Sequence, residues 1–363
     1  MTVVFAGGGT GGHLYPAIAI ADALRERRAD VAFIGTADRL EATIVPKAGY
    51  PLDTIASHPL PRSASFAVVR AIGANVKGTL QSLQLLARRK PDLVIATGGY
   101  VCFPVALAAR IRRLLRLSAA PIVLLEPNAA PGLTNRLLSP IVDEIWGAAG
   151  APERLGAKYR PTGVPVRSTL RSLPRREDAV ARLGLDPALR TLVAMGGSQG
   201  ARSINDAVVN LVQTNGVPAG WQLFALTGEG DYARVRSALQ NARPYLDDMA
   251  DAYAAADLLL TRAGASTLGE LAALGKPSIL VPYPFAAEAH QAANAGRFEA
   301  AGAAVVLTDD ELRAGGLGAV LARTVDAKRL AALAAGAAGL SVGDPLEAIL
   351  ARVDTLVSRK SER

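Results

Sequence analysis

The sequence contains a single cysteine, Cys102, among its 363 residues, which excludes an intrachain disulfide. Such sparse cysteine usage fits a reducing compartment. The three histidines and Cys102 show no spacing typical of metal ligands, and no Asp-x-Asp pair is present. The sequence therefore predicts a protein without a bound metal ion.

Long apolar runs are also missing. Residues 1–21 carry no formal charge, but they lack a basic stretch, and glycines stand where a signal peptide has its apolar core. The other long uncharged runs, 93–109 and 207–228, are interrupted by Gly, Pro, Asn or Gln, which disfavours a transmembrane helix. We therefore expect a soluble, cytoplasmic chain.

Acidic residues are scarce in the first half of the chain. Residues 1–163 hold 19 Lys and Arg against 11 Asp and Glu, whereas residues 164–363 hold 21 of each. No acid lies between Asp53 and Asp92, where the basic residues are Arg62, Arg70, Lys77, Arg88, Arg89 and Lys90. This asymmetry predicts an anionic partner for the first half. No aromatic platform accompanies the charge, which disfavours nucleic acid.

Apolar runs, glycine turns and helical patterns alternate in both halves. The first half contains "TVVFAGGGTGGH" and "PDLVIATGGYV", and the second contains "RTLVAMGGSQGA" and "ADLLLTRAGAST". Continuous Val, Ile and Leu runs between helices indicate parallel strands that are covered on both faces. The sequence predicts an α/β fold with two Rossmann-like, doubly wound parallel-sheet domains.

The boundary between these domains is expected near "PTGVPVRSTL", where two prolines and a glycine break regular structure. We predict a first domain over residues 1–163 and a second over residues 164–340. A last helix at about 345–358 follows the "SVGDP" breaker and is expected to pack back on the first domain.

The glycine turn after the first apolar run resembles an anion site. Free N–H groups and the helix dipole favour negative charge where a strand leads through glycines into a helix. Gly7, Gly9 and Gly12 match the G-x-G-x-x-G dinucleotide pattern. The acid expected after the second strand is missing, because "VAFIGTAD" ends in Gly35-Thr36. This disfavours a nicotinamide or flavin oxidoreductase, whereas a UDP-sugar epimerase or a non-catalytic UDP-sugar binder stays open.

The second half offers two further helix starts. In "MGGSQGA", Ser198 and Gln199 add hydrogen-bond donors that suit a diphosphate. In "TRAGASTLGE", Ser266 or Thr267 fits a helix cap, with Glu270 completing a capping box. The alternative is that the Glu270 carboxylate accepts two hydrogen bonds from a ribose diol.

Several long motifs occur together in one order, among them "GGGTGGHLYPAIAIADAL", "GTADRLEATIVPKAGY", "GGSQGA" and "PSILVPYPFAAEAHQAANA". Over roughly residues 1–310 the chain resembles the MurG-type peptidoglycan N-acetylglucosaminyltransferases. The resemblance implies the GT-B fold, two Rossmann-like domains facing a central cleft. It also implies inverting transfer of GlcNAc from UDP-GlcNAc to the muramyl C4 hydroxyl of lipid I, a polyprenyl-diphosphate-linked muramyl peptide. The product is lipid II for peptidoglycan synthesis, and no cofactor or metal is implied.

The resemblance also assigns site residues. The implied donor-binding residues are Ser198, Gln199, Leu246, Arg262, Thr267, Glu270, Gln291 and Asn294. The implied acceptor and diphosphate loops contain Thr10, Gly11, Gly12, Tyr100, Asn128 and Arg167. The chain departs from the family pattern mainly on the acceptor side, at Cys102, Phe103, Leu125, Pro127 and Val164, and also at His290.

His13 is the candidate general base. In an inverting displacement a base takes the acceptor hydroxyl proton, and an ordinary histidine pKa near 6.5 suits that role at neutral pH. The alternatives are that His13 binds a phosphate or hydrogen-bonds its own loop.

Two segments are candidates for contact with an anionic inner membrane surface. Residues 66–90 combine only basic charges with Phe66, Val69, Ile72, Val76, Leu80 and Leu83. Residues 109–118, "ARIRRLLRLS", form the second candidate. The alternative for each is a core helix with a basic solvent face. We expect a peripheral enzyme at the cytoplasmic face of the cell membrane.

Overall fold

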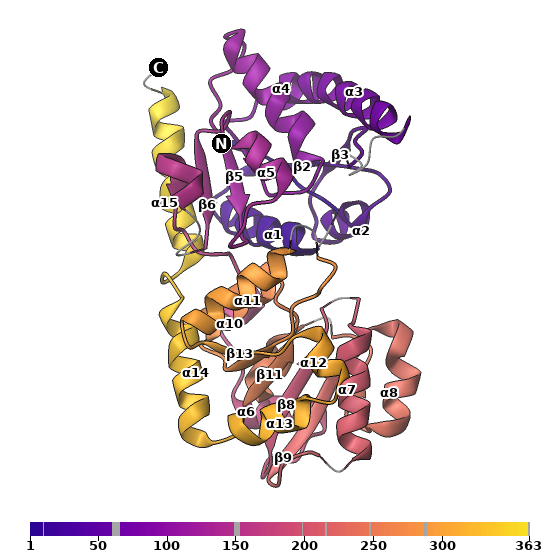
Figure 1. Ribbon diagram of the computed structural model, residues 1–363. Helices are drawn as coiled ribbons and strands as arrows, with labels where there is room; N and C mark the ends of the chain where they lie inside the picture. Colours follow the sequence, from indigo (N-terminus) through magenta and orange to yellow (C-terminus); the bar gives the residue numbers. More distant parts are fainter. Residues whose placement is uncertain are drawn as a thin grey trace. The chain divides into compact units, whose positions relative to one another are not determined.

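The computed structural model describes residues 1–9, 11–59, 66–148, 153–197, 199–214, 216–246, 248–286 and 289–361. The chain forms two compact units, one of Met1–Arg167 with Asp344–Arg363 and one of Ser168–Gly343. Each unit has its own parallel sheet with helices on both faces (Figure 1). This arrangement confirms the predicted fold class of two Rossmann-like, parallel-sheet domains.

The first sheet is parallel throughout and has seven strands. Its core strands are buried on both faces, as their continuous apolar runs predict: in the first strand Val3, Val4, Phe5 and Ala6 are all fully buried. In spatial order the strands are β3 (Leu52–Thr54), β2 (Asp30–Gly35), β1 (Thr2–Ala6), β4 (Leu93–Ala96), β5 (Ile122–Glu126), β6 (Glu144–Gly147) and β7 (Tyr159–Arg160).

Helices cover this sheet in two groups. Val3 and Phe5 share one core cluster with side chains of α1 (Gly11–Glu26), α2 (Leu40–Lys47) and α15 (Pro345–Ser361). Val4 and Ala6 share another with side chains of α3 (Phe66–Arg89), α4 (Cys102–Leu114) and α5 (Leu133–Leu138). The alternation follows from the strand period of two, which sends successive side chains to opposite faces.

The last helix belongs to the first unit. The Asp344 side chain accepts a 2.8 Å hydrogen bond from the Leu346 N–H at the start of α15. The Arg352 Nε then donates a 3.0 Å hydrogen bond to the buried Glu144 carboxylate at the start of β6. Helix α15 runs to Ser361, which extends it beyond the expected end near residue 358.

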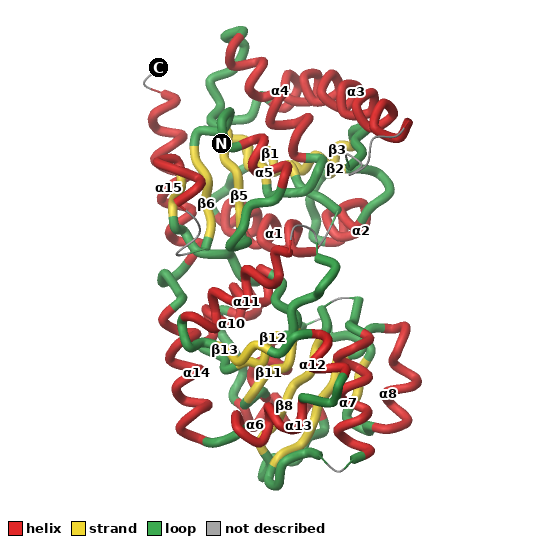
Figure 2. Tube along the Cα trace, viewed as in Figure 1, coloured by secondary structure: helices red, strands yellow, loops and turns green. Residues whose placement is uncertain are grey.

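The second sheet is also parallel and has six strands. In spatial order they are β10 (Ala242–Arg243), β9 (Trp221–Leu226), β8 (Arg190–Met195), β11 (Leu258–Thr261), β12 (Ser278–Leu280) and β13 (Ala304–Val306). In chain order this is the 3-2-1-4-5-6 arrangement of a doubly wound sheet. Figure 2 shows the strands of each sheet flanked by helices.

The helices of the second unit also form two groups. One covers the face of Val193 and Met195 and consists of α6 (Arg176–Leu183), α9 (Ala250–Ala255), α10 (Ala265–Leu274), α11 (His290–Ala300) and α14 (Ala327–Gly339). The other covers the face of Leu192 and Ala194 and consists of α7 (Arg202–Gln213), α8 (Tyr232–Ala238), α12 (Asp309–Arg313) and α13 (Leu317–Thr324). Short 3-10 turns lie at Glu153–Lys158, Ser168–Leu170 and Glu229–Asp231.

Each sheet has one point where the strand order reverses. In the first sheet the reversal lies between β1 and β4, and in the second between β8 and β11. Ligands of open parallel sheets bind beyond the carboxyl ends of the strands at such points. The glycine-rich loops that follow these four strands are therefore the places to look for sites.

Of the helices in the described parts of the chain, none combines the length and the apolar character that crossing a bilayer requires.

Candidate functional site

In the first unit, two glycine loops meet beyond β1 and β4. Gly98 and Gly99 have φ angles of +109° and +84°, which glycine adopts without strain. A Cβ atom on Gly98 would lie 2.4 Å from His13 Nδ1, and one on Gly99 would lie 2.6 Å from the Gly8 carbonyl oxygen. The His13 imidazole therefore lies against the backbone of Gly98, and the β1–α1 loop lies against the backbone of Gly99.

Four residues predicted for the acceptor side belong to this switch point. Helix α1 begins at Gly11, which places the amides of Gly11 and Gly12 and the side chain of His13 in its first turn. His13 is half-buried, and its Nδ1 atom is buried. A Cβ on Gly9 would lie 3.8 Å from Cε1 of Tyr100, so the tyrosine ring is close to the same loop. Thr10 lies outside the described residues.

Asn128 belongs to a loop built around a buried carboxylate. Oε1 of Glu126, the last residue of β5, accepts hydrogen bonds from the Asn128 N–H at 2.9 Å and from Asn128 Nδ2 at 3.1 Å. Its Oε2 accepts from Asn135 Nδ2 at 2.7 Å. Burial raises the Glu126 pKa, against the opposing effect of these hydrogen bonds. Glu126 thus organises the loop, although it is not among the residues predicted from the sequence.

Arg167 contacts helix α1. Its guanidinium carbon lies 4.8 Å from the centroid of the Tyr15 ring, a cation–π distance. Tyr15 is two residues beyond His13, so Arg167 lies beside the first turns of α1.

In the second unit, the β8–α7 loop is another glycine turn. Gly197 and Gly200 have φ angles of +84° and +74°. A Cβ on Gly200 would lie 2.1 Å from the Thr227 carbonyl oxygen, so the loop packs tightly on the end of β9. Gln199 is exposed at the tip of this turn, and Ser198 lies outside the described residues.

The capping role predicted for Ser266 or Thr267 is wrong. Helix α10 begins at Ala265 and its N-cap residue is Gly264, so both hydroxyl residues already lie inside the helix. Glu270 lies in the second turn and cannot complete a capping box there. It is instead buried, and its Oε2 accepts a 2.5 Å hydrogen bond from the Tyr253 hydroxyl.

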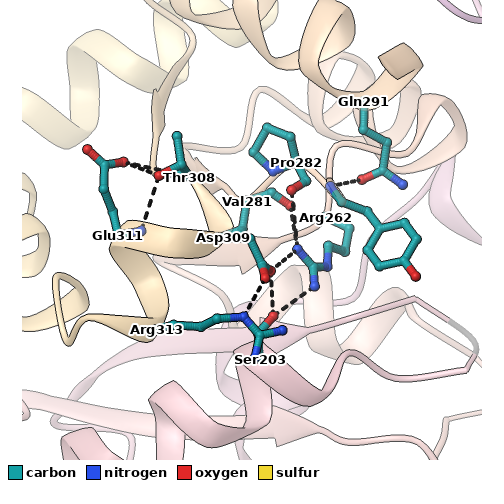
Figure 3. Close-up of polar contacts among 10 residues, drawn as sticks. Ser203, Arg262, Val281, Pro282, Gln291, Thr308, Asp309, Glu311 and Arg313 are labelled. Carbon is teal, nitrogen blue, oxygen red and sulfur yellow. Dashed lines mark hydrogen bonds and ion pairs between the residues drawn. The ribbon is translucent and has the colours of Figure 1, made fainter. Parts of the chain in front are cut away.

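Arg262, directly after β11, is the centre of a buried polar network (Figure 3). Its NH1 donates to Asp309 Oδ1 at 2.7 Å and its NH2 donates to Ser203 Oγ at 2.8 Å. The Ser203 hydroxyl donates to the same Asp309 oxygen at 2.6 Å. The guanidinium therefore ties β11 to the starts of α7 and α12, a role that the sequence did not reveal.

Asp309 is the anion of this network. Burial alone would raise its pKa, but hydrogen bonds from Ser203, Arg313 and Arg262 outweigh that effect and lower the pKa to about 2. A buried carboxylate of this kind remains ionised at neutral pH because its partners are fixed around it.

The two predicted residues of α11 hold neighbouring loops. Gln291 Oε1 accepts a 2.9 Å hydrogen bond from the Tyr283 N–H, as Figure 3 shows. Asn294 is buried, and its Nδ2 donates to the Ala263 carbonyl oxygen at 3.1 Å. Asn294 thereby joins α11 to the loop between β11 and α10.

The remaining predicted donor residues lie on two segments. Leu246 follows β10 and is partly buried against the core cluster that contains Tyr253. Thr267 is half-exposed in the first turn of α10. Among the described residues, no group of three His, Cys, Asp or Glu side chains is arranged to hold a metal ion.

Helix α3 exposes an apolar stripe in the basic part of the first unit. Val69, Ile72, Val76 and Leu80 are 66%, 52%, 56% and 58% exposed. The helix buries Ala71, Gly78, Ser82 and Leu86 instead. The helix thus packs one face against the core, with Leu83 among the partly buried residues there, and leaves these four apolar side chains outside the core. The side chain of Phe66 lies outside the described residues.

The second basic segment also exposes apolar side chains. Leu114, Leu115 and Leu117, at the end of α4 and just beyond it, are 67%, 63% and 61% exposed. Helices α3 and α4 pack side by side on one face of the first sheet (Figure 1).

Comparison with known proteins identifies the family. Residues 3–146 match the N-terminal domain model of glycosyltransferase family 28, and residues 191–343 match its C-terminal domain model. A protein of Desulforudis audaxviator (strain MP104C) is 40% identical over 379 residues, which cover 99% of each chain. Its name is UDP-N-acetylglucosamine--N-acetylmuramyl-(pentapeptide) pyrophosphoryl-undecaprenol N-acetylglucosamine transferase. The chain belongs to this transferase family.

Other comparisons agree with this assignment. A transferase of the same name from Carboxydothermus hydrogenoformans is 37% identical over 100% of both chains. The crystal structure of MurG from Acinetobacter baumannii matches with a TM-score of 0.78 at 26% identity, covering 98% of this chain and 99% of that one. The calicheamicin glycosyltransferase CalG4 matches with a TM-score of 0.70 at 17% identity, which shows the shared GT-B fold alone.

Proposed function

We propose that this protein transfers GlcNAc from UDP-GlcNAc to the C4 hydroxyl of the muramyl sugar of lipid I, giving lipid II. The observation that carries the proposal is its identity of 37% and 40%, over nearly the whole chain, to transferases named for that reaction. Each parallel sheet has one point where the strand order reverses, and ligands of such sheets bind at these points. Two such points, one in each unit, suit a transfer between two substrates.

The donor is proposed to bind the second unit. Gln199 lies in the turn that leads into α7, where free N–H groups and the helix dipole favour a diphosphate. Ser198 is proposed to contact the same diphosphate. The Glu270 carboxylate, held at one oxygen by Tyr253, is proposed to accept the ribose hydroxyls. The backbone near Leu246 would contact the uracil edge, Thr267 the nucleotide, and Gln291 the GlcNAc hydroxyls. Arg262 and Asn294 would act by fixing the loops that carry these groups.

The acceptor is proposed to bind the first unit, with His13 as the general base. The acceptor hydroxyl attacks the anomeric carbon while UDP leaves from the opposite face, so the configuration inverts. His13 takes the hydroxyl proton, and main-chain amides and helix N-termini rather than a metal ion stabilise the departing UDP. Gly11, Gly12, Tyr100, Asn128 and Arg167, together with Thr10, would surround the acceptor sugar and its diphosphate.

The protein is proposed to act as a peripheral enzyme at an anionic membrane surface on the cytoplasmic side. Val69, Ile72, Val76 and Leu80 form an apolar stripe on α3 among basic residues. An exposed apolar stripe with surrounding Lys and Arg is typical of an interfacial helix, in which burial of the apolar face and attraction to anionic headgroups add.

The test is transfer of radiolabelled GlcNAc from UDP-GlcNAc to a lipid I analogue, with and without EDTA. We expect labelled lipid II of inverted anomeric configuration, at a rate that EDTA leaves unchanged. Loss of activity with EDTA would contradict the metal-independent step. Conversion of UDP-GlcNAc to another UDP-sugar without any acceptor would instead favour an epimerase, the alternative that the sequence left open.

A further inference from the structure

Glu41 is a buried carboxylate to which the proposed reaction assigns no role. It is the second residue of α2, and its side chain is 0% exposed. Its Oε2 accepts a 2.9 Å hydrogen bond from the Gly9 N–H. Its Oε1 accepts from the Thr36 N–H at 3.1 Å and from the Thr36 hydroxyl at 2.6 Å. One carboxylate therefore joins the loop after β1 to the end of β2.

Glycines on both sides make room for this carboxylate. A Cβ atom on Gly8 would lie 2.3 Å from Glu41 Oε1, and one on Gly35 would lie 2.7 Å from Glu41 Cγ. Real Cβ atoms do not approach so closely, so both positions need glycine for Glu41 to occupy its place. The glycine run after β1 is therefore shaped in part around the Glu41 side chain.

The contacts continue from Glu41 to the candidate base. Gly8, beside the carboxylate, presents its carbonyl oxygen to Gly99, where an added Cβ would lie 2.6 Å away. The adjacent Gly98 lies against the His13 ring. Gly9, whose N–H is bonded to Glu41, has a φ of +86° and lies two residues before α1, the helix that carries His13. A shift of the β1–α1 loop would thus change both the start of α1 and the surface on which the imidazole rests.

We propose that Glu41 is a positioning residue for the acceptor site: its carboxylate fixes the β1–α1 loop and thereby sets the position of the His13 imidazole. This inference rests on the proposed function in that His13 is the base it positions. Glu41 is fully buried, so it is proposed to act through the loop rather than by contact with the substrate. Because its three bonded donors all point at carboxylate oxygens, an amide in its place would turn an NH2 group toward at least one of those donors.

The first experiment reads the His13 ring without any turnover. The chain has three histidines, so the imidazole ¹H–¹³C spectrum of the full-length protein contains three sets of signals, and His13→Gln assigns one of them. In Glu41→Gln we expect the His13 signals to shift while those of His58 and His290 stay in place. Glu26→Gln, which removes a carboxylate from the exposed end of α1, is the matched control and should leave all three sets unchanged.

The second experiment separates positioning from a general loss of structure. We expect Glu41→Gln to lower kcat for GlcNAc transfer by about 10- to 100-fold, with UDP affinity within twofold of the wild type. Thr36→Ser keeps the hydroxyl donor and should retain near wild-type kcat, whereas Thr36→Val removes it and should lower kcat. If Glu41→Gln does not fold, Thr36→Ser and Thr36→Val provide the test, again through kcat and UDP affinity.

The outcomes are distinguishable. Unchanged His13 signals in Glu41→Gln, or a kcat within twofold of the wild type in a wild type that transfers GlcNAc, would overturn the positioning role. Equal losses of kcat and UDP affinity would also overturn it, because they indicate a global defect. A wild type that transfers no GlcNAc would contradict the proposed function, and the ring spectra would still decide whether Glu41 positions His13.

Discussion

The Tyr253 hydroxyl donates a 2.5 Å hydrogen bond to Oε2 of Glu270, and both side chains are buried. Tyr253 lies on α9, before strand β11 in the chain, and Glu270 lies on α10, after that strand. The hydrogen bond therefore joins the two helices that flank β11 in the sequence. The phenol fixes the direction of a carboxylate that is proposed to accept the ribose hydroxyls.

Removal of this phenol is expected to weaken donor binding. A hydrogen bond to a charged group contributes about 1.5–3 kcal/mol, so Tyr253→Phe should raise KM for UDP-GlcNAc by roughly 10- to 100-fold and change kcat less. The control is Tyr232→Phe, which removes a half-buried phenol from α8 in the same unit. Initial rates at varied UDP-GlcNAc concentration give both constants. A KM equal to that of the wild type would show that Tyr253 does not contribute to donor binding.

Replacement of His13 is expected to stop turnover without releasing the nucleotide. General-base catalysis contributes about 10²- to 10⁴-fold, so kcat of His13→Ala should fall by that factor. UDP binding by calorimetry should stay nearly intact, since the donor site is proposed for the other unit. His58→Ala changes an exposed histidine in the same unit and should behave as the wild type. A near-normal kcat in His13→Ala would show that His13 is not the general base.

The Asp309 network is expected to stabilise the second unit in a pH-dependent way. The folded-state pKa is about 2 against an ordinary 3.8. The lowered pKa therefore contributes about 2 kcal/mol above pH 4, which is lost as the pH falls from about 4 to about 2. Removing one partner of a buried ion pair costs about 3 kcal/mol or more, so Asp309→Asn should show at least that loss at pH 7.

This prediction can be measured through a tryptophan of the second unit. In a Trp146→Phe background, Trp221 is the remaining tryptophan, and its fluorescence reports urea unfolding of that unit. Asp310→Asn, an exposed neighbour, is the control and should change the unfolding free energy little. A gap between wild type and Asp309→Asn that stays constant from pH 6 to pH 3 would argue against the lowered pKa.

The apolar stripe of α3 is expected to mediate membrane binding. Val69→Glu with Val76→Glu should reduce sedimentation with vesicles that contain anionic lipid by at least 10-fold, because two apolar contacts become repulsive charges. Ala331→Glu with Ala335→Glu adds the same charge to exposed positions on α14 of the second unit and should have little effect. Binding should also weaken as salt rises. Equal loss in both pairs would point to net charge rather than to the stripe.

The architecture was predictable because it follows from repeated local patterns. Buried parallel strands need apolar residues on both faces. Continuous apolar runs such as Val3 to Ala6 therefore indicate the fold class from the sequence alone. The glycine turns after β1 and β8, which the sequence marked as anion sites, lie at the two switch points of the strand order. The predicted site residues of the first unit that the structure describes do lie on loops and helix starts beyond β1, β4 and β5 or beside α1.

Residues that act through distant partners were not predictable in this way. The bond of Glu41 to Gly9 spans 32 positions, and that of Arg262 to Asp309 spans 47, distances at which no local pattern operates. The same bond occupies the N–H of Gly9, one of the three glycines of the G-x-G-x-x-G match. The capping error has a local cause, since the N-cap is Gly264, two residues before Ser266 and three before Thr267.

A crystal structure of the protein with UDP-GlcNAc bound tests the proposed donor site most directly. The diphosphate is expected on the β8–α7 turn beside Gln199, with the ribose hydroxyls on the Glu270 carboxylate and no metal ion at the phosphates. A nucleotide bound instead on the Gly7–Gly12 turn of the first unit would contradict that expectation.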